Sequence, residues 1–505
     1  MSSRQPFFYD VTLRDGNQAL KKPWNTNEKE IIFKRLLKLG VQGIEVGFSG
    51  ASDMDFEACA HLANLAPENV VISGLARAVK HDIDKVAQAI KNAPKPRIHT
   101  FIAMNPIGLE HVLKKPLCEV KKIAIEAVSY AKSVLPEYGE VQFTPEHFGD
   151  CRENLDEVID AVQDVVKAGA KIINLPNTVE RFRPMEFIKM VEKMRNALPK
   201  DIIIAVHCHN DLGMASATTV ESFFAGADQL ECSLNGLGER AGNTNMYEVA
   251  VSLYNSGVNV PLNMSKIYGT SLRVSEMSNV PIWEKAPIIG ADALAHRSGI
   301  HQDGAVKTKH LEKGAYRAFN PSLIGRNEDE KLGFTSQSGK TAIYEILNAT
   351  PYKITMQEAI RLAPIAKSAA EEIGELSPEK LLELYMEEIF TVKGDFKLID
   401  FKRIDGNKFN LEFSHKDKLF DMIGNDEGPL VACLDALAKA GFPLNLIHYE
   451  QIALNEEKGV KADAMSIIHF GSQGDDFVVA RALDSSTAKA NVKAIFNGLN
   501  LLNKG

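Results

Sequence analysis

The chain has few cysteines, and none of them form a CxxC pair. Six are scattered through 505 residues. A disulfide framework needs regularly spaced pairs, so this distribution predicts free thiols in a reducing, cytoplasmic compartment. The six are Cys59, Cys118, Cys151, Cys208, Cys232 and Cys433.

Long apolar runs and an excess of positive charge are also missing. No apolar stretch approaches the roughly 20 residues of a membrane-spanning helix, and residues 1–5 hold no apolar signal core. The net charge is −8 without a basic stripe, which argues against a general nucleic-acid binder. We therefore expect small-molecule partners, with no membrane and no nucleic acid.

Residues 1–275 alternate strand and helix signals. Eight predicted strands with helices between them indicate an α/β fold, a (β/α)8 TIM barrel. The alternative is an open doubly wound sheet, which would want a glycine-rich turn after its first strand, where the chain has Arg14-Asp15-Gly16 instead. The strands are expected at 7–13, 41–47, 70–75, 97–103, 140–145, 171–176, 202–208 and 229–234.

The ends of the predicted helices support this arrangement. Asn27 with Glu30 resembles a capping box for a helix that ends near Leu39, and Pro184 suits the first turn of another helix. Three helices end at a glycine, the residue that tolerates a left-handed C′ position. Each of these glycines is followed, five positions on, by a polar residue inside an apolar strand. The pairs are Gly40 and Glu45, Gly169 and Asn174, and Gly226 and Glu231.

Beyond residue 275 the pattern changes, and we divide the chain into four parts. Residues 1–275 are the catalytic barrel, and residues 276–325 are a linker subdomain with a dense polar segment around His301. Residues 326–389 are a helical linker subdomain with breaks at Pro351 and Pro378, and residues 390–505 are a quasi-duplicated α+β module. The strands of this module are expected at 396–404, 408–414, 446–454, 464–470 and 476–483, and its helices at 430–440 and 486–499.

Polar side chains cluster at the carboxyl ends of the predicted barrel strands, which is where barrel enzymes carry their active sites. Random scatter would place such residues at both ends, so the clustering predicts an enzyme. The residues are Arg14, Asp15, Glu45, Arg77, His99, Glu146, Thr178, His207 and His209, followed by a polar loop at 235–243.

Two of these segments could together hold one metal ion. Residues i and i+2 of a strand share a face, so His207 and His209 can point at one cation, and Asp15 can supply an oxygen if its strand lies alongside. Cys208 would then point to the opposite face as a small buried hydrophobe. Imidazole and carboxylate ligands suit Zn, Mn, Fe or Mg with open positions for a substrate.

Several of these residues also have a structural interpretation. Arg14 and Asp15 could form a simple ion pair that caps the barrel, and His99 could be a histidine of the core rim. Glu45 and Glu231 could bind backbone or basic groups inside the rim, an interpretation that we favour for Glu231.

Four segments resemble those of the α-isopropylmalate synthases, which belong to a wider group of Claisen-condensing metallo-barrels that includes the citramalate and homocitrate synthases. The resemblance covers nearly the whole chain. The segments are Thr12-Leu13-Arg14-Asp15-Gly16-Asn17-Gln18, Ile44-Glu45-Val46-Gly47-Phe48, His207-Cys208-His209-Asn210-Asp211-Leu212-Gly213 and Gly238-Glu239-Arg240-Ala241-Gly242-Asn243.

The resemblance implies roles for the matching positions. His301 would come from the partner subunit of a homodimer whose sites cross between subunits. The implied metal ligands are Asp15, His207, His209 and Asn243, the catalytic residues are Arg14, Glu146, His301 and Tyr316, and the substrate-binding residues are Arg14, Glu45, His99 and Thr178.

The resemblance also implies the reaction. Acetyl-CoA would condense with 3-methyl-2-oxobutanoate, and thioester hydrolysis would give 2-isopropylmalate and CoA in the first committed step of leucine biosynthesis. The cofactor would be a divalent metal ion such as Mg²⁺, Mn²⁺ or Zn²⁺. The turn at 426–429 resembles part of a leucine-binding allosteric domain, and whether leucine, isoleucine or nothing regulates this chain stays open.

Other functions are weighed against this one. A citramalate or homocitrate synthase differs in the oxo acid, whose pocket we expect Leu75, Ile102 and Ala103 to line. An acyl-CoA lyase would not need the linker and sensor parts, and a biotin-dependent carboxyltransferase would carry a Met-Lys-Met segment, which this sequence lacks. A non-catalytic sensor would not need the intact set of charged residues at the strand ends.

Overall fold

The computed structural model describes residues 4–327, 331–425, 428–454, 463–471 and 477–503. The chain divides into two compact units. The first comprises Met1–Leu294 and Arg317–Asp329, and the second comprises Ala295–Tyr316 and Glu330–Gly505. Among the described residues, no helix is both long and apolar enough to cross a membrane.

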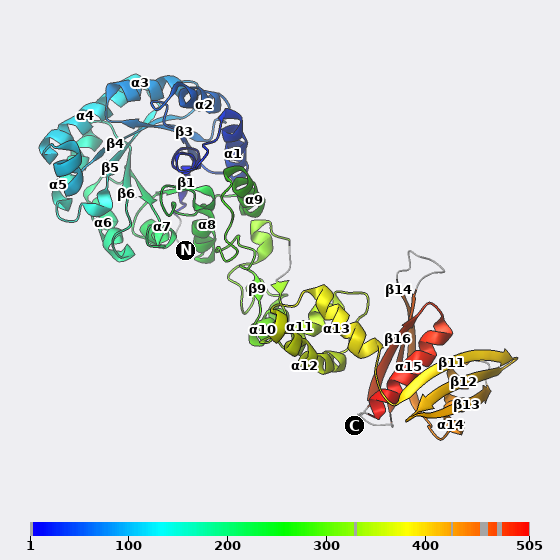
Figure 1. Cartoon of the computed structure of the whole chain (residues 1–505). Coiled ribbons are helices and arrows are strands. Elements are labelled where there is room, and N and C mark those ends of the chain that lie inside the picture. The colour runs from blue at the N-terminus through cyan, green and yellow to red at the C-terminus, as the bar shows by residue number, and fades with distance from the viewer. Residues whose placement is uncertain (1–3, 328–330, 426–427, 455–462, 472–476, 504–505) are drawn as a thin grey trace. The chain divides into compact units, whose positions relative to one another are not determined.

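Eight parallel strands close into a barrel in the first unit, so the predicted fold class is confirmed. Each strand pairs with the next one along the chain, and β8 returns to pair with β1. Figure 1 shows these strands inside a ring of helices. The strands are β1 (Phe7–Asp10), β2 (Gly43–Gly47), β3 (Val71–Arg77), β4 (Pro96–Ala103), β5 (Glu140–Glu146), β6 (Ile172–Asn177), β7 (Ile203–Cys208) and β8 (Gln229–Cys232).

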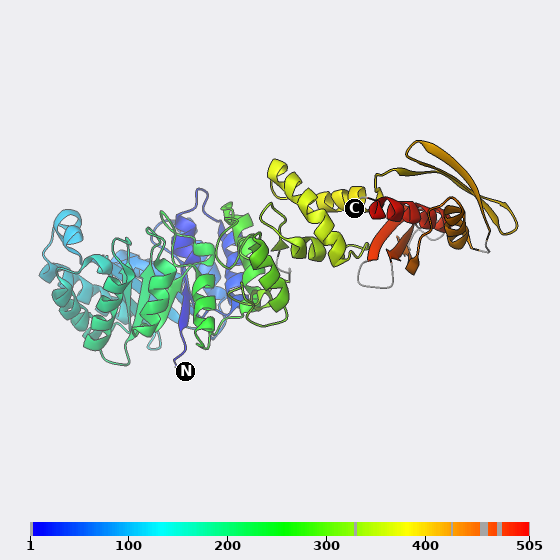
Figure 2. The ribbon, with the colours of Figure 1, turned by 90° about the horizontal axis from the view of Figure 1, so that it is seen from below.

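A helix follows each strand and covers the outside of the barrel, which Figure 2 shows from the side. Helical spacing places Ile32, Phe33 and Leu36 of the first helix on its buried face, against the strands. Gly40 ends that helix with φ 85°, the left-handed conformation expected there. The helices are α1 (Thr26–Leu39), α2 (Asp53–Asn64), α3 (Lys80–Ala89), α4 (Leu117–Val134), α5 (Leu155–Lys167), α6 (Pro184–Ala197), α7 (Ala215–Phe224), α8 (Met246–Asn255) and α9 (Ile267–Ser278).

The first strand is shorter than predicted. We expected a strand over 7–13, but β1 ends at Asp10, and the chain continues into one wide helical turn, η1 (Thr12–Gly16). The Asp10 carboxylate accepts hydrogen bonds from the backbone N–H and the hydroxyl of Thr12, at 2.9 and 2.7 Å. Such local side-chain bonds compete with a strand ladder. Arg14 and Asp15 therefore lie on a turn rather than on a strand.

The capping box of α1 lies two residues earlier than predicted. Asn25, not Asn27, accepts a hydrogen bond from the backbone N–H of the residue three positions on, which is Glu28 rather than Glu30. The spacing Asn-x-x-Glu occurs twice here, so the sequence alone does not choose between the two pairs. In the structure, the Trp24 N–H donates to Asn17 Oδ1 at 2.7 Å, which fixes the chain just before Asn25. The prediction for Pro184, at the start of α6, is confirmed.

The second unit begins with a helical part. A two-residue strand, β9 (Ala295–His296), pairs with β10 (Lys331–Leu332) beside α10 (Gly299–Thr308). The region expected to be helical contains α11 (Lys340–Asn348), α12 (Met356–Ile373) and α13 (Pro378–Phe390). Their apolar faces, including Leu362 and Tyr385, form a core together with Phe334, which precedes α11.

The C-terminal part repeats one plan of three antiparallel strands and a helix, as the quasi-duplication predicted. A strand over 418–425 was missed because it follows the preceding one after a two-residue turn. The turn predicted at 426–429 lies partly outside the described residues. The first copy is β11 (Phe396–Asp405), β12 (Lys408–His415), β13 (Lys418–Asn425) and α14 (Pro429–Lys439), and the second is β14 (Leu446–Leu454), β15 (Asp463–Gly471), β16 (Phe477–Asp484) and α15 (Thr487–Leu502).

Candidate active site at the barrel mouth

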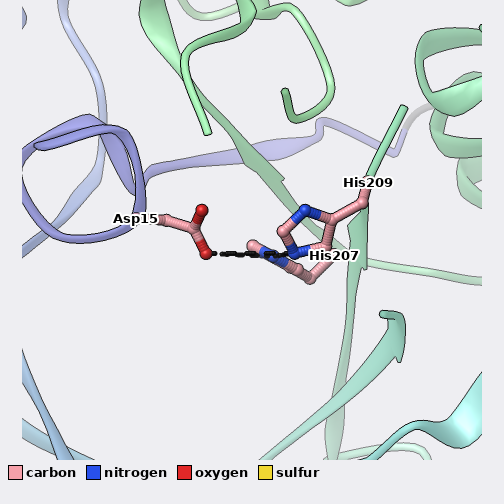
Figure 3. A group of neighbouring side chains, drawn as sticks. All are labelled: Asp15, His207 and His209. Atoms are coloured by element: carbon pink, nitrogen blue, oxygen red, sulfur yellow. Dashed lines mark hydrogen bonds and ion pairs between the residues drawn. The ribbon is translucent and has the colours of Figure 1, made fainter. Parts of the chain in front are cut away.

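Three side chains with metal-ligating atoms meet at the carboxyl ends of the barrel strands (Figure 3). Asp15 Oδ2 lies 3.7 Å from His207 Nε2 and 3.9 Å from His209 Nε2. The two ring nitrogens are 3.2 Å apart, and all three ligand atoms lie within 4.8 Å of one another. The structure thus brings together three residues that the sequence placed far apart.

The local backbone explains this convergence. His207 is on β7 and His209 directly follows that strand, so the two rings share one face. Cys208 between them is fully buried, and burial raises the pKa of its thiol to about 12, as suits a small hydrophobe. Asp15 reaches the same point from the η1 turn, whose Arg14, Asp15 and Gly16 N–H groups all donate to the Val11 carbonyl.

Asn243, the fourth predicted ligand, lies beside this group. Its backbone forms an antiparallel bridge with His209. Its amide Nδ2 donates to the Leu237 carbonyl at 3.2 Å, which leaves Oδ1 as the free acceptor. That oxygen is buried and has no hydrogen-bond partner among the described residues. An orphaned buried acceptor beside a carboxylate and two imidazoles fits a bound divalent cation.

The protonation states of Asp15 and His209 also fit a cation. Burial raises the pKa of Asp15, but the Arg14 guanidinium and the two imidazoles outweigh it and hold this pKa well below its usual range. Burial and the neighbouring His207 lower the pKa of His209 to about 3. At neutral pH the group is therefore an ionised carboxylate next to a neutral imidazole, the forms in which these side chains bind metals.

A chain of buried polar groups leads away from Asp15. Arg14 Nη1 lies 2.5 Å from Asp15 Oδ2, and Arg14 Nε lies 2.5 Å from Glu45 Oε2. The other Glu45 oxygen is 2.5 Å from His99 Nδ1, and His99 Nε2 is 2.6 Å from Thr144 Oγ1. Burial raises the pKa of the Glu45 carboxyl, but the opposite effects of Arg14 and His99 together are larger, and they lower this pKa to about 2. The Arg14–Asp15 ion pair that we considered as a structural alternative is present. Asp15 also belongs to the group of three candidate metal ligands with His207 and His209.

A cavity of about 350 Å³ opens over these residues. Glu45 is not among its lining residues, and Ile102 and Ala103, which we expected there, do not line it either. On β4, alternation instead turns His99 and Phe101 inward. The lining residues are Arg14, Asp15, Gln18, Phe48, Leu75, His99, Phe101, Thr144, Glu146, Asn174, Pro176, Thr178, His207, His209, Glu239 and Arg240.

The candidate metal ligands and the apolar lining residues come from different strands of the barrel. The candidate ligands lie on β7 (His207) or follow β1, β7 and β8, and these three strands are consecutive because β8 pairs with β1. The apolar lining residues come from β2 to β6. They are Phe48, Leu75, Phe101 and Pro176.

Glu146 and Thr178 line the cavity as predicted, but Arg77 does not. Burial raises the pKa of the Glu146 carboxyl above its ordinary value, although the adjacent His147 lowers it in part. The Thr178 hydroxyl oxygen accepts a hydrogen bond from the His147 N–H at 3.1 Å, which fixes the two loops together. Arg77 is exposed and binds Asp82 instead, with Nε 2.6 Å from the carboxylate.

His301 and Tyr316 belong to the second unit. Their rings stack with centroids 4.3 Å apart, and both side chains are exposed. Gly304, on the same helix as His301, lets the Tyr316 ring approach, since a Cβ there would lie 2.4 Å from the ring. The structure therefore brings these two predicted catalytic residues together on one surface.

Two polar contacts next to the candidate site were not predicted from the sequence. Glu231, interpreted as structural, lies with Oε2 3.1 Å from Nδ1 of His207. Asn174, for which we assigned no role, lines the cavity and donates to Thr144 Oγ1 at 3.0 Å. A signal for both was present, because they are polar residues inside apolar strands, five positions after a helix-ending glycine. Glu45 is the third member of that pattern.

Comparison with known proteins gives two family matches. A family described as HMGL-like matches residues 5–274, and one described as alpha-isopropylmalate synthase, post-catalytic domain-like, matches residues 292–348. Among solved structures, the HMG-CoA lyase from Brucella melitensis is similar, with a TM-score of 0.47 and 18% sequence identity, over 55% of this chain and 100% of that one.

Similar sequences extend over most of the chain. The chain is 57% identical over 384 residues to 2-isopropylmalate synthase 2 of Leptospira interrogans, and the alignment covers 76% of this chain and 88% of that protein. It is 33% identical over 507 residues to 2-isopropylmalate synthase of Syntrophus aciditrophicus, covering 98% and 96% of the two chains. The corresponding enzyme of Clostridium kluyveri is 34% identical over 513 residues, covering 99% and 97%.

A closed (β/α)8 barrel with a carboxylate–imidazole cluster in a cavity at its mouth defines a class of barrel enzymes that use a divalent metal ion. The comparisons narrow this class. The chain belongs to the HMGL-like family and, within it, to the 2-isopropylmalate synthases. The resemblance that the four sequence segments carried is thereby confirmed.

Proposed function

We propose that the chain condenses acetyl-CoA with 3-methyl-2-oxobutanoate and hydrolyses the thioester, giving 2-isopropylmalate and CoA in the first committed step of leucine biosynthesis. The observation that carries this proposal is the 57% identity to a 2-isopropylmalate synthase over 384 residues. The charged cavity at the barrel mouth supports it, because one space contains a cationic group, candidate metal ligands and a carboxylate of raised pKa.

The 2-oxo acid would bind against the Arg14 end of the cavity. A divalent cation held by Asp15, His207, His209 and Asn243 would polarise the keto group when bound. Arg14 keeps its charge at any working pH and is held by two carboxylates, so it can stabilise an oxyanion without reorganising. Thr178 and His99 would contact the carboxylate end of the substrate.

The branched end of the oxo acid requires an apolar pocket. Leu75, Phe48, Phe101 and Pro176 line the cavity and supply such a wall. An apolar wall discriminates one methylene by about 10–200-fold. We therefore propose that these residues set the preference among oxo acids of different size.

Removing a proton from the acetyl methyl group requires a base whose pKa is near the working pH. Glu146 is a candidate because it lines the cavity and burial raises its pKa. His301 is the other candidate, since histidine is the side chain most often used as a general base, and Tyr316 stacks on it. Glu45 is assigned to substrate binding through the two residues it holds, Arg14 and His99.

We further propose a cytoplasmic homodimer in which His301 and Tyr316 of one subunit complete the site of the other. Their exposure on one surface of the second unit supports this role. We also propose that the chain has four parts, divided at residues 275, 325 and 389. Residues 390–505 would form an amino-acid-binding regulatory domain, and leucine is the first ligand to test. Mixing an Arg14→Ala protein with a His301→Ala protein should restore activity if the sites cross between subunits.

A thiol-release assay tests the proposed function. The protein is mixed with acetyl-CoA, a divalent metal and a panel of 2-oxo acids, with and without leucine. Thiol release that is fastest with 3-methyl-2-oxobutanoate supports the proposal. Faster release with pyruvate or 2-oxoglutarate would indicate a citramalate or homocitrate synthase instead, and release without any oxo acid would contradict condensation.

A further inference from the structure

The barrel interior beneath the cavity is polar, although the packed layers inside such barrels are usually filled by branched apolar side chains. Arg97, Gln142, Gln229 and Glu231 are each at most 1% exposed. They come from β4, β5 and β8. Burying such groups is costly unless they are hydrogen-bonded to one another, so their connections need an explanation.

Arg97 sets the orientation of both glutamine amides. A guanidinium can only donate hydrogen bonds. Arg97 Nη1 lies 2.7 Å from Gln229 Oε1 and 3.2 Å from Gln142 Oε1, so both amide oxygens face the arginine. Both NH₂ groups must then turn the other way. They donate to Glu231 Oε1, at 2.7 Å from Gln142 and 3.1 Å from Gln229.

Glu231 in turn contacts His207 and determines which of its ring nitrogens carries the proton. Its second oxygen, Oε2, accepts from Asn174 Nδ2 at 3.4 Å and lies 3.1 Å from His207 Nδ1. Three amide donors converge on the carboxylate, which acts as an acceptor, so His207 Nδ1 carries the proton and donates it. The opposite ring nitrogen, Nε2, then presents its lone pair where Asp15 and His209 lie.

We propose that the buried column Arg97–Gln142/Gln229–Glu231 fixes His207 as its Nδ1–H tautomer and so prepares Nε2 to bind a divalent cation. Glu231 is a positioning residue, because it acts through His207 and does not line the cavity. The inference rests on the metal site proposed above. It extends that site through the barrel to Arg97, whose other partner, Glu140, lies 2.7 Å away and is partly exposed.

An isosteric substitution tests the column. In Glu231→Gln the new side chain would turn its carbonyl to the two glutamine donors and its NH₂ to His207 Nδ1. The ring proton would then move to Nε2, on the cation side. We expect the dissociation constant for Mn²⁺, measured on the metal-free full chain by competition with a chelating dye, to rise about 10–100-fold.

Two matched variants separate orientation from general damage. Glu231→Asp keeps an acceptor-only carboxylate and should recover part of the affinity. Glu140→Gln makes the same change at the other partner of Arg97, outside the column, and should leave the dissociation constant unchanged. Circular dichroism checks that each variant is folded. If Glu231→Gln does not fold, long-range ¹H–¹⁵N spectra of histidine-labelled wild-type protein decide directly, with the His207 signals identified by their loss in His207→Gln.

The outcomes are distinct. Wild-type Mn²⁺ affinity in folded Glu231→Gln, or an Nε2–H tautomer at His207 in the metal-free wild type, would overturn the column's role and leave the metal site standing. Absence of Mn²⁺ binding by the wild-type protein would overturn both. An equal loss of affinity in Glu140→Gln would show that charge near Arg97, rather than orientation of His207, controls the site, and would also overturn the inference.

Discussion

Each unit of the molecule buries an arginine against a carboxylate, with different results. In the barrel, Arg14 lies between Asp15 and Glu45 and also lines the cavity. In the second unit, Arg481 Nε lies 2.7 Å from Glu358 Oε1, and both side chains are at most 3% exposed. Arg481 donates its Nη1 and Nη2 hydrogen bonds to the carbonyls of Tyr352 and Lys353, at 2.7 and 2.9 Å.

The Arg14 and Arg481 ion pairs differ in the groups that surround them. Arg481 of β16 binds the loop before α12 and Glu358 of that helix, so its role is to hold these elements together. Arg14 borders a cavity that two imidazoles also line, and next to His209 lies Asn243, whose buried oxygen has no hydrogen-bond partner among the described residues. A buried ion pair alone is weak evidence of stability or function. The cavity and the unsatisfied Asn243 oxygen make the barrel pair a candidate for chemistry.

The sharpest way to break this comparison is to remove a candidate ligand. His207→Ala should abolish metal-dependent turnover, because the cation would lose one of two imidazoles. Thiol release and Mn²⁺ binding are measured together. His111→Ala, at an exposed histidine, is the control. Turnover close to wild type with unchanged metal dependence would remove His207 from the site.

Glu146→Gln tests whether the cavity carboxylate is the base. We expect kcat to fall about 10²–10⁴-fold. A base works deprotonated and burial raises the pKa of Glu146, so kcat/KM should rise with pH through a midpoint above the ordinary 4.5, and this limb should vanish in the variant. If the limb survives in Glu146→Gln but is lost in His301→Asn, the base is His301.

Arg14→Lys sharpens the comparison within the barrel. A lysine keeps the charge but cannot bridge Asp15 and Glu45 with one planar group. Turnover should fall about 10²–10³-fold, the usual cost of losing a preorganised oxyanion donor. Arg77→Lys makes the same change at an exposed arginine outside the cavity and should leave turnover unchanged. Equal activity of both variants would reduce Arg14 to a structural ion pair.

Arg481→Met should change stability and leave the barrel site intact. Removing one partner of a buried pair typically costs about 3–5 kcal/mol, since Glu358 is left without its counter-charge. Calorimetry should show a less stable second unit, while the Mn²⁺ dissociation constant stays at the wild-type value. The double variant Arg481→Met/Glu358→Gln should regain part of the stability. A weaker Mn²⁺ affinity in Arg481→Met would contradict the separation of the two pairs.

Much of the barrel could be predicted because its strands and helices leave periodic signals that depend on short segments. Polar residues at strand ends, such as His207 and Glu146, were found for the same reason. The exact starts and ends depend on competition between local partners. Asn25 and Asn27 offer the same capping spacing, and Asp10 diverts the chain into a turn where apolar residues suggested a continued strand.

Side-chain direction inside the barrel was harder to predict. The contact of Glu231 with His207 was not predicted, because the sequence does not show that the two glutamines occupy one carboxylate oxygen while Asn174 and His207 share the other. The same holds for the cavity wall, where Phe101 rather than Ile102 faces inward. Such contacts join residues from different strands, and their identity depends on barrel register, which a single sequence does not reveal.

The arrangement of the cavity around the barrel has a consequence for how such enzymes diversify. Because the candidate metal ligands come from β7, β8 and β1, whereas Leu75 lies on β3 and Phe48 follows β2, mutations that enlarge or shrink the wall at these two positions change no residue of the metal cluster. After gene duplication, one copy could drift toward a bulkier or smaller acid through Leu75 or Phe48 while its sibling kept the ancestral preference.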